Sequence, residues 1–279
     1  DFITRGMQLR LDNNIYIAKD TTAEELIVKT SQSGKSLSET IEHFTKNYGV
    51  TSTSGSLKLI ELMGELDDQN RGIFIPALNI MTQKADSRQG EEKNKEDIKI
   101  KLDRYGIIKD NILIAYADKQ LSAAINILNN KYISGDITVS DPYGYDVALE
   151  VIEMNTKKKY KFNGDDIETV NLHIIVNSNV GEQHSKENIY DSTNMEYLFM
   201  QQADALREDI YAIIKFAQTH NVDILGFRNG MIRRHPIRWE KIKDDWNSIF
   251  PNLNVEIDVK SRILRTYDIT QPNGMRSME

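Results

Sequence analysis

The stretch that decides the fold of the C-terminal part spans residues 223–265 and reads DILGFRNGMIRRHPIRWEKIKDDWNSIFPNLNVEIDVKSRILR. Pro236 is a favoured residue for the first turn of a helix, and apolar residues follow it at helical spacing as far as Ile249. Pro251 ends this helix, because the residue before a proline avoids the α region. Apolar and charged residues then alternate over 255–263, which indicates a strand. The block predicts a helix that packs on a closing strand.

Large apolar side chains form a stripe along this predicted helix. They are Trp239, Ile242, Trp246, Ile249 and Phe250, which lie at i, i+3, i+7, i+10 and i+11 and so share one helical face. We predict that both tryptophans are core anchors against the final sheet. An exposed docking face is the alternative, because tryptophan is common where binding energy concentrates. The structural signature of the block is therefore Asp223, Gly226, Phe227, Pro236, Trp239, Trp246 and Phe250.

Four arginines precede or begin this helix, and we place them in a loop: Arg228, Arg233, Arg234 and Arg238. They are the candidate partner contact, with an acidic protein or phospholipid headgroups as the expected partner. An ordinary solvated loop is the alternative. We predict no nucleic-acid binding, because the cluster is short and lacks neighbouring aromatic residues for base stacking.

The rest of the chain predicts helices and mostly antiparallel strands. A long helix is expected over 191–220, where apolar residues recur three and four apart, and it must lie across a sheet or project to a neighbour. Upstream, turn residues joining two apolar runs predict a hairpin over 105–116. The further expected elements are a helix over 121–132 and strands over 137–139, 147–152, 159–162 and 170–176.

The first hundred residues read as a mixed helical region. Helices are expected from Thr21, over 38–48 and over 54–66, with a short strand over 15–18. An extended run follows over 71–83, and its Pro76 predicts an edge strand. Residues 84–101 hold eleven charged residues in eighteen and read as a linker. The fold class is therefore α+β and multi-domain.

Tests for catalytic, metal and cofactor chemistry give no positive result. Ser33-Gly34-Lys35-Ser36 ends like a phosphate-binding loop, but Lys29 stands where the full pattern needs a glycine. The five histidines are scattered, and the chain has no cysteine. Adjacent acids occur as Asp67-Asp68, Asp165-Asp166 and Asp244-Asp245, and we interpret them as solvated surface. We predict no enzyme and no cofactor or metal site, with a hydrolase of dispersed residues left open.

The chain has a net charge of −7. Its sequence has no apolar stretch near the roughly 20 residues that are needed to span a bilayer. The chain opens at Asp1 and not at methionine, so it reads as a trimmed piece whose anchoring segment would lie upstream.

The 223–265 block resembles the C-terminal region of the Ger(x)C family, the C-subunit lipoproteins of spore germinant receptors. The matching residues run from Asp223-Ile224-Leu225-Gly226-Phe227, through Arg234-x-Pro236-x-x-Trp239 and Trp246-x-x-x-Phe250, to Ile263-x-Arg265. Weaker matches are Asp1 with Arg5 and Arg10, Ile75-Pro76, and the hairpin from Gly106 to Tyr116. Arg228 and Tyr267 depart from the pattern, because the family usually has glycine at both places.

The resemblance implies a lipid-anchored body at the outer face of the spore inner membrane, joined to it by an upstream anchor. It implies partnership with membrane-spanning A and B subunits, no known enzymatic activity and a three-domain architecture. We place those domains at 1–100 (the remainder of the first), 101–184 and 185–279. Two functions stay open: an assembly or signalling subunit, and a nutrient-sensing module that itself binds the germinant.

Overall fold

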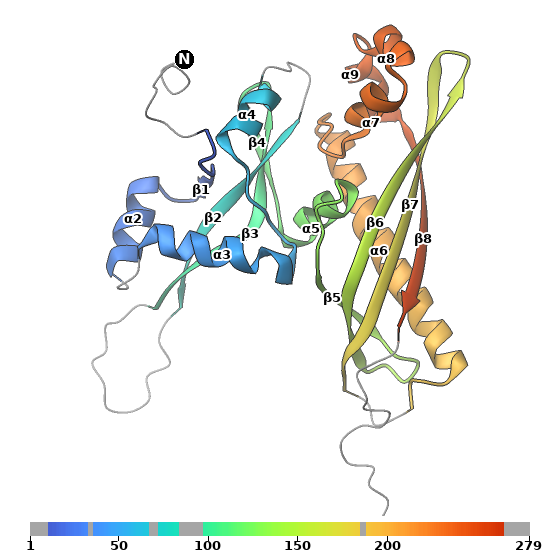
Figure 1. Ribbon diagram of the computed structural model, residues 1–279, viewed down its shortest axis with the longest axis horizontal. Coiled ribbons are helices and arrows are strands. Elements are labelled where there is room, and N and C mark those ends of the chain that lie inside the picture. The colour runs from blue at the N-terminus through green and yellow to red at the C-terminus, as the bar shows by residue number, and fades with distance from the viewer. Residues whose placement is uncertain (1–10, 33–35, 67–71, 84–96, 185–187, 265–279) are drawn as a thin grey trace, which may run out of the picture. The chain divides into compact units, whose positions relative to one another are not determined.

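The computed structural model describes residues 11–32, 36–66, 72–83, 97–184 and 188–264. The chain divides into two compact units, residues 1–48 with 53–122, and residues 49–52 with 123–279. Each unit is built on its own four-stranded sheet with packed helices (Figure 1). The predicted α+β, multi-domain class is confirmed, whereas the division into three domains stays a prediction. Several predictions lie outside the described residues: those on 1–10, 33–35, 67–68, 84–96, Arg265 and Tyr267.

The sheet of the first unit has the order β1-β2-β3-β4. These strands are β1 (Ile17–Lys19), β2 (Ile73–Gln83), β3 (Asp97–Lys109) and β4 (Ile112–Ala117). β1 runs parallel to β2, and the other neighbours are antiparallel. Asp110 and Asn111 join β3 to β4 with φ of 49° and 62°, as a two-residue hairpin turn requires. The predicted hairpin is confirmed, but residues 97–101, predicted as linker, are strand, because isoleucine and lysine alternate there.

Pro76 was predicted to mark an edge strand, and this is wrong, because β2 lies between β1 and β3. Pro76 pairs with Tyr105, whose N–H points away from β2 and donates to Ser122 Oγ at 3.1 Å. On its other side β2 pairs with β1 only over Ala77–Asn79. A proline here therefore removes no hydrogen bond from the ladder.

Three helices pack on this unit: α2 (Ala23–Gln32), α3 (Leu37–Thr51) and α4 (Leu59–Leu66). A capping box lies at the N-terminus of α2 and another at that of α3. In the box of α3, Glu39 N–H donates to Ser36 Oγ at 3.1 Å, and Ser36 N–H donates back to Glu39 Oε2 at 3.0 Å. Leu26 of α2 then packs on Leu78 and Ile100 of the sheet.

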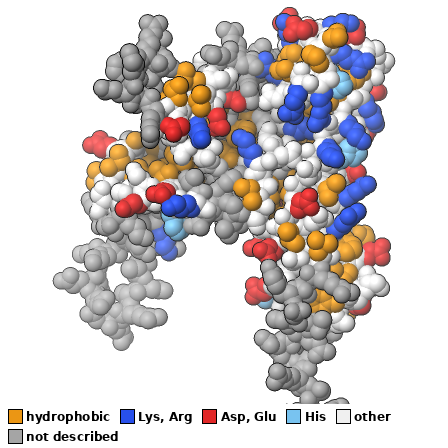
Figure 2. Space-filling view, in the orientation of Figure 1, with side chains coloured by type: hydrophobic (Ala, Val, Ile, Leu, Met, Phe, Trp, Pro, Cys, Tyr) orange, Lys and Arg blue, Asp and Glu red, His pale blue; other side chains and the backbone are white. Residues whose placement is uncertain are grey.

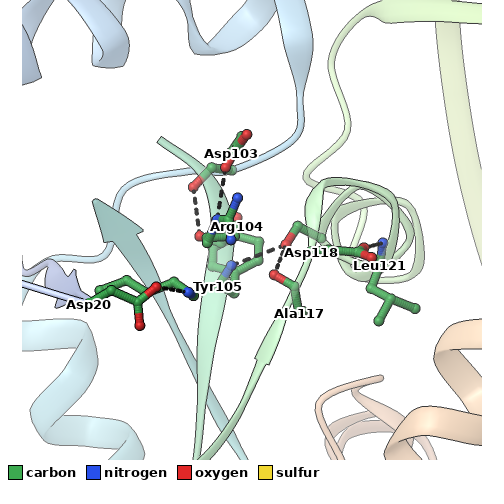
Figure 3. Close-up of polar contacts among 10 residues, drawn as sticks. Asp20, Asp103, Arg104, Tyr105, Ala117, Asp118 and Leu121 are labelled. Carbon is green, nitrogen blue, oxygen red and sulfur yellow. Dashed lines mark hydrogen bonds and ion pairs between the residues drawn. The ribbon is translucent and has the colours of Figure 1, made fainter. Parts of the chain in front are cut away.

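A buried serine joins the end of this sheet to the next helix, α5 (Lys119–Leu128). Ser122 Oγ accepts from Tyr105 N–H and donates to Ala117 O at 3.2 Å. Asp118 caps the helix by accepting from Leu121 N–H at 2.9 Å, and Figure 3 shows these contacts around Tyr105, Ala117 and Asp118. One hydroxyl thus satisfies main-chain groups of both β3 and β4.

The sheet of the second unit has the order β5-β6-β7-β8, with strands β5 (Gly135–Ser140), β6 (Asp146–Asn163), β7 (Asp166–Gln183) and β8 (Asn254–Ile263). β7 and β8 are parallel, and the other pairs are antiparallel. The strands predicted at 147–152 and 159–162 are one strand, β6. β6 continues its alternation between the two predicted strands, with Lys157 and Lys159 exposed and Lys158 partly buried.

The predicted long helix is α6 (Ser192–Thr219), which begins after the N-cap Asp191. It contacts the two edge strands, β5 and β8, and so lies across one face of the sheet (Figure 1). Leu198 packs with Leu149 and Val180 in the core beneath it. None of the helices that the structure describes is long and apolar enough to cross a membrane.

The region after α6 differs from the prediction in two places. It forms α7 (Phe227–Arg234), α8 (Pro236–Ile242), α9 (Trp246–Ile249) and η1 (Phe250–Asn252). The arginines predicted in a loop therefore lie on helices. The single helix expected from Pro236 to Ile249 is interrupted after Ile242. In a continuous helix Trp239 and Trp246 would be about 10 Å apart along the axis, whereas the interruption brings their ring centroids to 5.4 Å.

Replacing Ser122 with alanine should destabilise the first unit. The N–H of Tyr105 would then be buried without a partner, and we expect a loss of about 1–3 kcal/mol in the free energy of unfolding. Urea unfolding measures this change. Ser56→Ala, at an exposed serine, is the matched control and should stay within about 0.5 kcal/mol of the parent. Equal values for the two variants would contradict the role given to Ser122.

Candidate functional site

The candidate site is the start of α7, where a buried carboxylate caps the helix. Asp223 is 7% exposed and accepts hydrogen bonds from the N–H groups of Leu225, Phe227 and Arg228, at 3.2, 3.2 and 2.7 Å. The N-cap residue is Gly226, with φ of 71°, and it has no side chain to cap with. Asp223 therefore supplies the acceptor from three residues upstream.

Strand β6 binds the same segment through two side chains. Lys158 Nζ donates to the carbonyl of Leu225, and Tyr160 Oη donates to the carbonyl of Phe227 at 2.9 Å. In return, Arg234 at the end of α7 donates to the main-chain carbonyl of Lys158. Side chains of β6 thus donate to carbonyl groups at the start of α7, and a side chain at the end of α7 donates to a carbonyl group of β6.

Burial changes the titration of these groups. It lowers the pKa of Lys158 to about 8, against the opposing effect of the nearby Asp223 carboxylate. It raises the pKa of Tyr160. Burial also raises the pKa of Asp223, although its backbone hydrogen bonds and Lys158 act in the opposite direction. Perturbed pKa values often mark active sites, but here the polar atoms are used to hold main-chain groups.

Gly230 allows α7 to approach β6 closely. A Cβ atom at this position would lie 1.8 Å from Tyr160 Oη and 2.8 Å from its Cζ. Any larger residue must displace the tyrosine and break its bond to α7. Sequence reasoning missed Lys158, Tyr160 and Gly230. A signal was present, because Lys158 stands in the same alternation as Tyr160 and Phe162, which face the helices.

The aromatic stripe lies in the core. Trp239, Trp246 and Phe250 are 5%, 1% and 1% exposed. The rings of Trp246 and Phe250 are 6.0 Å apart, and Phe227 of α7 lies 6.3 Å from Phe250. The tryptophans are core anchors, as predicted, and the alternative of an exposed docking face is wrong.

The four arginines do not share one environment. The guanidinium of Arg228 lies 5.3 Å from the ring centroid of Trp239, and that of Arg238 lies 4.0 Å from the ring of Phe162. Arg233 and Arg234 are exposed. The candidate partner contact therefore consists of Arg233, Arg234 and Arg238, while Arg228 is partly buried against the aromatic cluster. Figure 2 shows Lys and Arg side chains gathered over this part of the second unit.

Metal chemistry gains no support from the described part of the chain, where no group of three or more His, Asp or Glu is placed to hold an ion. Asp165 forms an ion pair with Lys241 at 2.6 Å, and Glu240 pairs with Lys243 at 2.6 Å. These exposed carboxylates therefore form ion pairs with lysines at the surface.

Comparison with known protein families identifies both parts of the chain. The family model described as spore germination B3/GerAC like, C-terminal, matches residues 103–267, which is more than half of the chain. The model of the spore germination protein N-terminal domain matches residues 1–80. The chain belongs to the GerAC-like spore germination family. This family is not a known enzyme family.

Two relatives of the GerAC-like chain agree with this assignment. Spore germination protein KC of Bacillus subtilis (strain 168) is 31% identical over 62 residues, which cover 22% of this chain and 15% of the relative. The crystal structure of the GerBC protein aligns with a TM-score of 0.60 at 18% identity, covering 75% of this chain and 61% of that one. The second likeness concerns the fold alone. The chain spans less than two thirds of either relative.

Gly230→Ala should destabilise this GerAC-like domain by about 3 kcal/mol, because the new methyl group overlaps Tyr160 Oη. Chemical denaturation measures the loss. Gly64→Ala is the matched control, since Gly64 lies in α4 with open space around it. That substitution should stabilise the protein by roughly 0.5–1 kcal/mol, because alanine is the better helix former. The double variant Gly230→Ala/Tyr160→Ala should lose less stability than the sum of the two single variants, and strict additivity would contradict the overlap.

Lys158 should make stability depend on pH above neutrality. Its pKa is about 8 in the folded protein against an ordinary value of 10.5. Between these values the unfolded chain holds a proton that the folded chain has released, so the free energy of unfolding rises with pH. Lys158→Met should remove this rise, which amounts to roughly 2 kcal/mol by pH 10.

Urea titrations of parent and variant from pH 7 to pH 10 test this expectation. The exposed Lys260→Met variant should keep the slope of the parent. Parallel profiles for Lys158→Met and the parent would show that the buried lysine does not set the slope.

Proposed function

We propose that this chain is the body of a non-enzymatic C subunit of a spore germinant receptor. It acts with membrane-spanning A and B subunits in nutrient-triggered germination. The observation that carries the proposal is the pair of family matches, with the N-terminal germination domain at 1–80 followed by the GerAC-like domain at 103–267. The fold likeness to GerBC adds support.

The geometry at α7 supports a non-enzymatic role. An active site needs polar atoms that are free to meet a substrate, whereas Asp223 accepts main-chain N–H groups on both oxygens. Lys158 and Tyr160 donate to main-chain carbonyls. These groups position a helix pair, and we infer that the protein works through surfaces presented by that pair.

The proposed location is the outer face of the spore inner membrane, with a lipid anchor upstream of Asp1. Attachment at one end would hold the protein beside the membrane-spanning subunits, and none of the helices among the described residues would need to cross the membrane. The proposal thus assigns the chain an extracytoplasmic, membrane-attached role in the receptor.

A strain whose sole germinant receptor includes this protein tests the function. Spores lacking the gene should lose the optical-density drop that nutrients trigger, yet should still respond to a trigger that bypasses receptors. Affinity-tagged protein from wild-type spore membranes should co-purify the A and B subunits. Normal nutrient germination in the deletion strain would overturn the proposal.

Thermal unfolding of the purified chain with amino acids and sugars separates this function from direct nutrient sensing. An assembly subunit should show no shift in Tm. Saturable stabilisation by one nutrient, lost on competition with its close analogue, would favour the sensing module instead.

A further inference from the structure

A cationic and apolar surface lies at the corner between α7 and α8, which Figure 1 places at one end of the second unit. A single residue, His235, separates the two helices, and its N–H donates to Met231 O at 2.8 Å. Trp239 N–H then donates to His235 O at 2.9 Å. The corner is therefore a defined turn held by main-chain bonds.

Arginine side chains dominate the charge of this corner. Between Asp223 and Glu240 the sequence has no acidic residue and four arginines. No carboxylate of the described residues forms an ion pair with Arg233, Arg234 or Arg238. The nearby acids Asp165 and Glu240 are instead paired with lysines. A local excess of positive charge thus exists on a chain whose net charge is −7.

Two apolar side chains lie among these arginines. Ile237 is 79% exposed, the highest value for a large hydrophobic side chain in the described residues, and Ile232 is 39% exposed. Ile232 precedes Arg233, and Ile237 precedes Arg238. Their solvent exposure is unfavourable in water, and a surface that accepts both charge and apolar groups would remove that cost.

The arginines are positioned and not fully flexible. Arg234 donates to the carbonyl of Lys158, and Arg238 stacks on Phe162. Both contacts tie the corner to β6, so the cations and isoleucines are presented together. Because these side chains are already ordered, less conformational entropy would be lost when the corner binds a partner.

We propose that the α7–α8 corner binds the surface of a membrane that contains anionic lipids. The guanidinium groups would meet lipid phosphates, and Ile237 would enter the boundary between headgroups and acyl chains. An acidic protein would also attract the arginines. A lipid surface fits better, because it offers phosphate and hydrocarbon side by side to a protruding apolar tip.

Flotation of the purified 279-residue chain with vesicles tests the proposal. The chain should bind phosphatidylcholine vesicles that contain phosphatidylglycerol and should not bind phosphatidylcholine alone. High salt should weaken binding. Arg233→Glu reverses one charge and should weaken binding by about 30-fold. Arg262→Glu, at an exposed arginine of β8, is the matched control and should change it far less.

A second measurement reports insertion directly. Because the chain has no cysteine, Ile237→Cys can carry an environment-sensitive fluorophore at one site. Its emission should rise and shift to the blue with anionic vesicles. A label at Ile152→Cys, whose isoleucine is 49% exposed on β6, should not respond.

Absence of binding to anionic vesicles would overturn the proposal. So would equal weakening by Arg233→Glu and Arg262→Glu, or equal fluorescence responses at the two labelled sites. If vesicle binding were absent while Arg233→Glu released an acidic receptor subunit in co-purification, the corner would be a protein interface instead.

Discussion

The capping of α7 by Asp223 is the constraint on which the C-terminal architecture depends. A short helix of eight residues gains little from its own hydrogen bonds, so it needs capping and tertiary contacts to form. Asp223 satisfies three N–H groups at its start. The left-handed conformation of Gly226 turns the chain so that one carboxylate can reach all of them. Without this cap, the N–H groups of Leu225 and Phe227, two buried residues, would lose their hydrogen-bond acceptor.

Strand β6 completes the arrangement from the other side and explains why a lysine is tolerated in a partly buried place. The carbonyl group of Leu225, which precedes α7, would lose its side-chain donor if β6 presented apolar side chains only, and that of Phe227 would lose its bond to the strand. Lys158 and Tyr160 donate to them, and Asp223 lies close enough to lower the cost of the lysine charge. The contact is close because Gly230 lacks a side chain. Cap, strand and glycine therefore act as one unit, and a change in one alters the contacts of the others.

Local patterns in the sequence predicted those elements that depend mainly on contacts between residues close in sequence. The α6 helix follows from its apolar spacing and from Asp191, and the β3–β4 hairpin follows from its Asp110-Asn111 turn. The arginines were wrongly placed in a loop, because Asn229 and Gly230 are weak helix formers. The close approach of Tyr160 to Gly230 joins positions about seventy residues apart and has no local signal. The break after Ile242 was missed for a related reason. In the structure this break accompanies the contact between Trp239 and Trp246, whose ring centroids are 5.4 Å apart. The burial of the tryptophans was predictable from the spacing of the aromatic stripe, whereas the Lys158 and Tyr160 contacts required the packing of β6 against α7.

The same packing determines what is left at the surface. Burying Trp239 and Met231 on the inner side of the α7–α8 corner turns the intervening Ile232, Arg233 and Ile237 outward. A free chain could fold Ile237 against a neighbour, but Pro236 restricts φ at the preceding turn and Arg238 is held on Phe162. The exposure of this isoleucine thus follows from the way the corner is packed. The interior polar groups Asp223, Lys158 and Tyr160 are hydrogen-bonded to the main chain, and the proposed membrane contact therefore relies on such outward-facing residues.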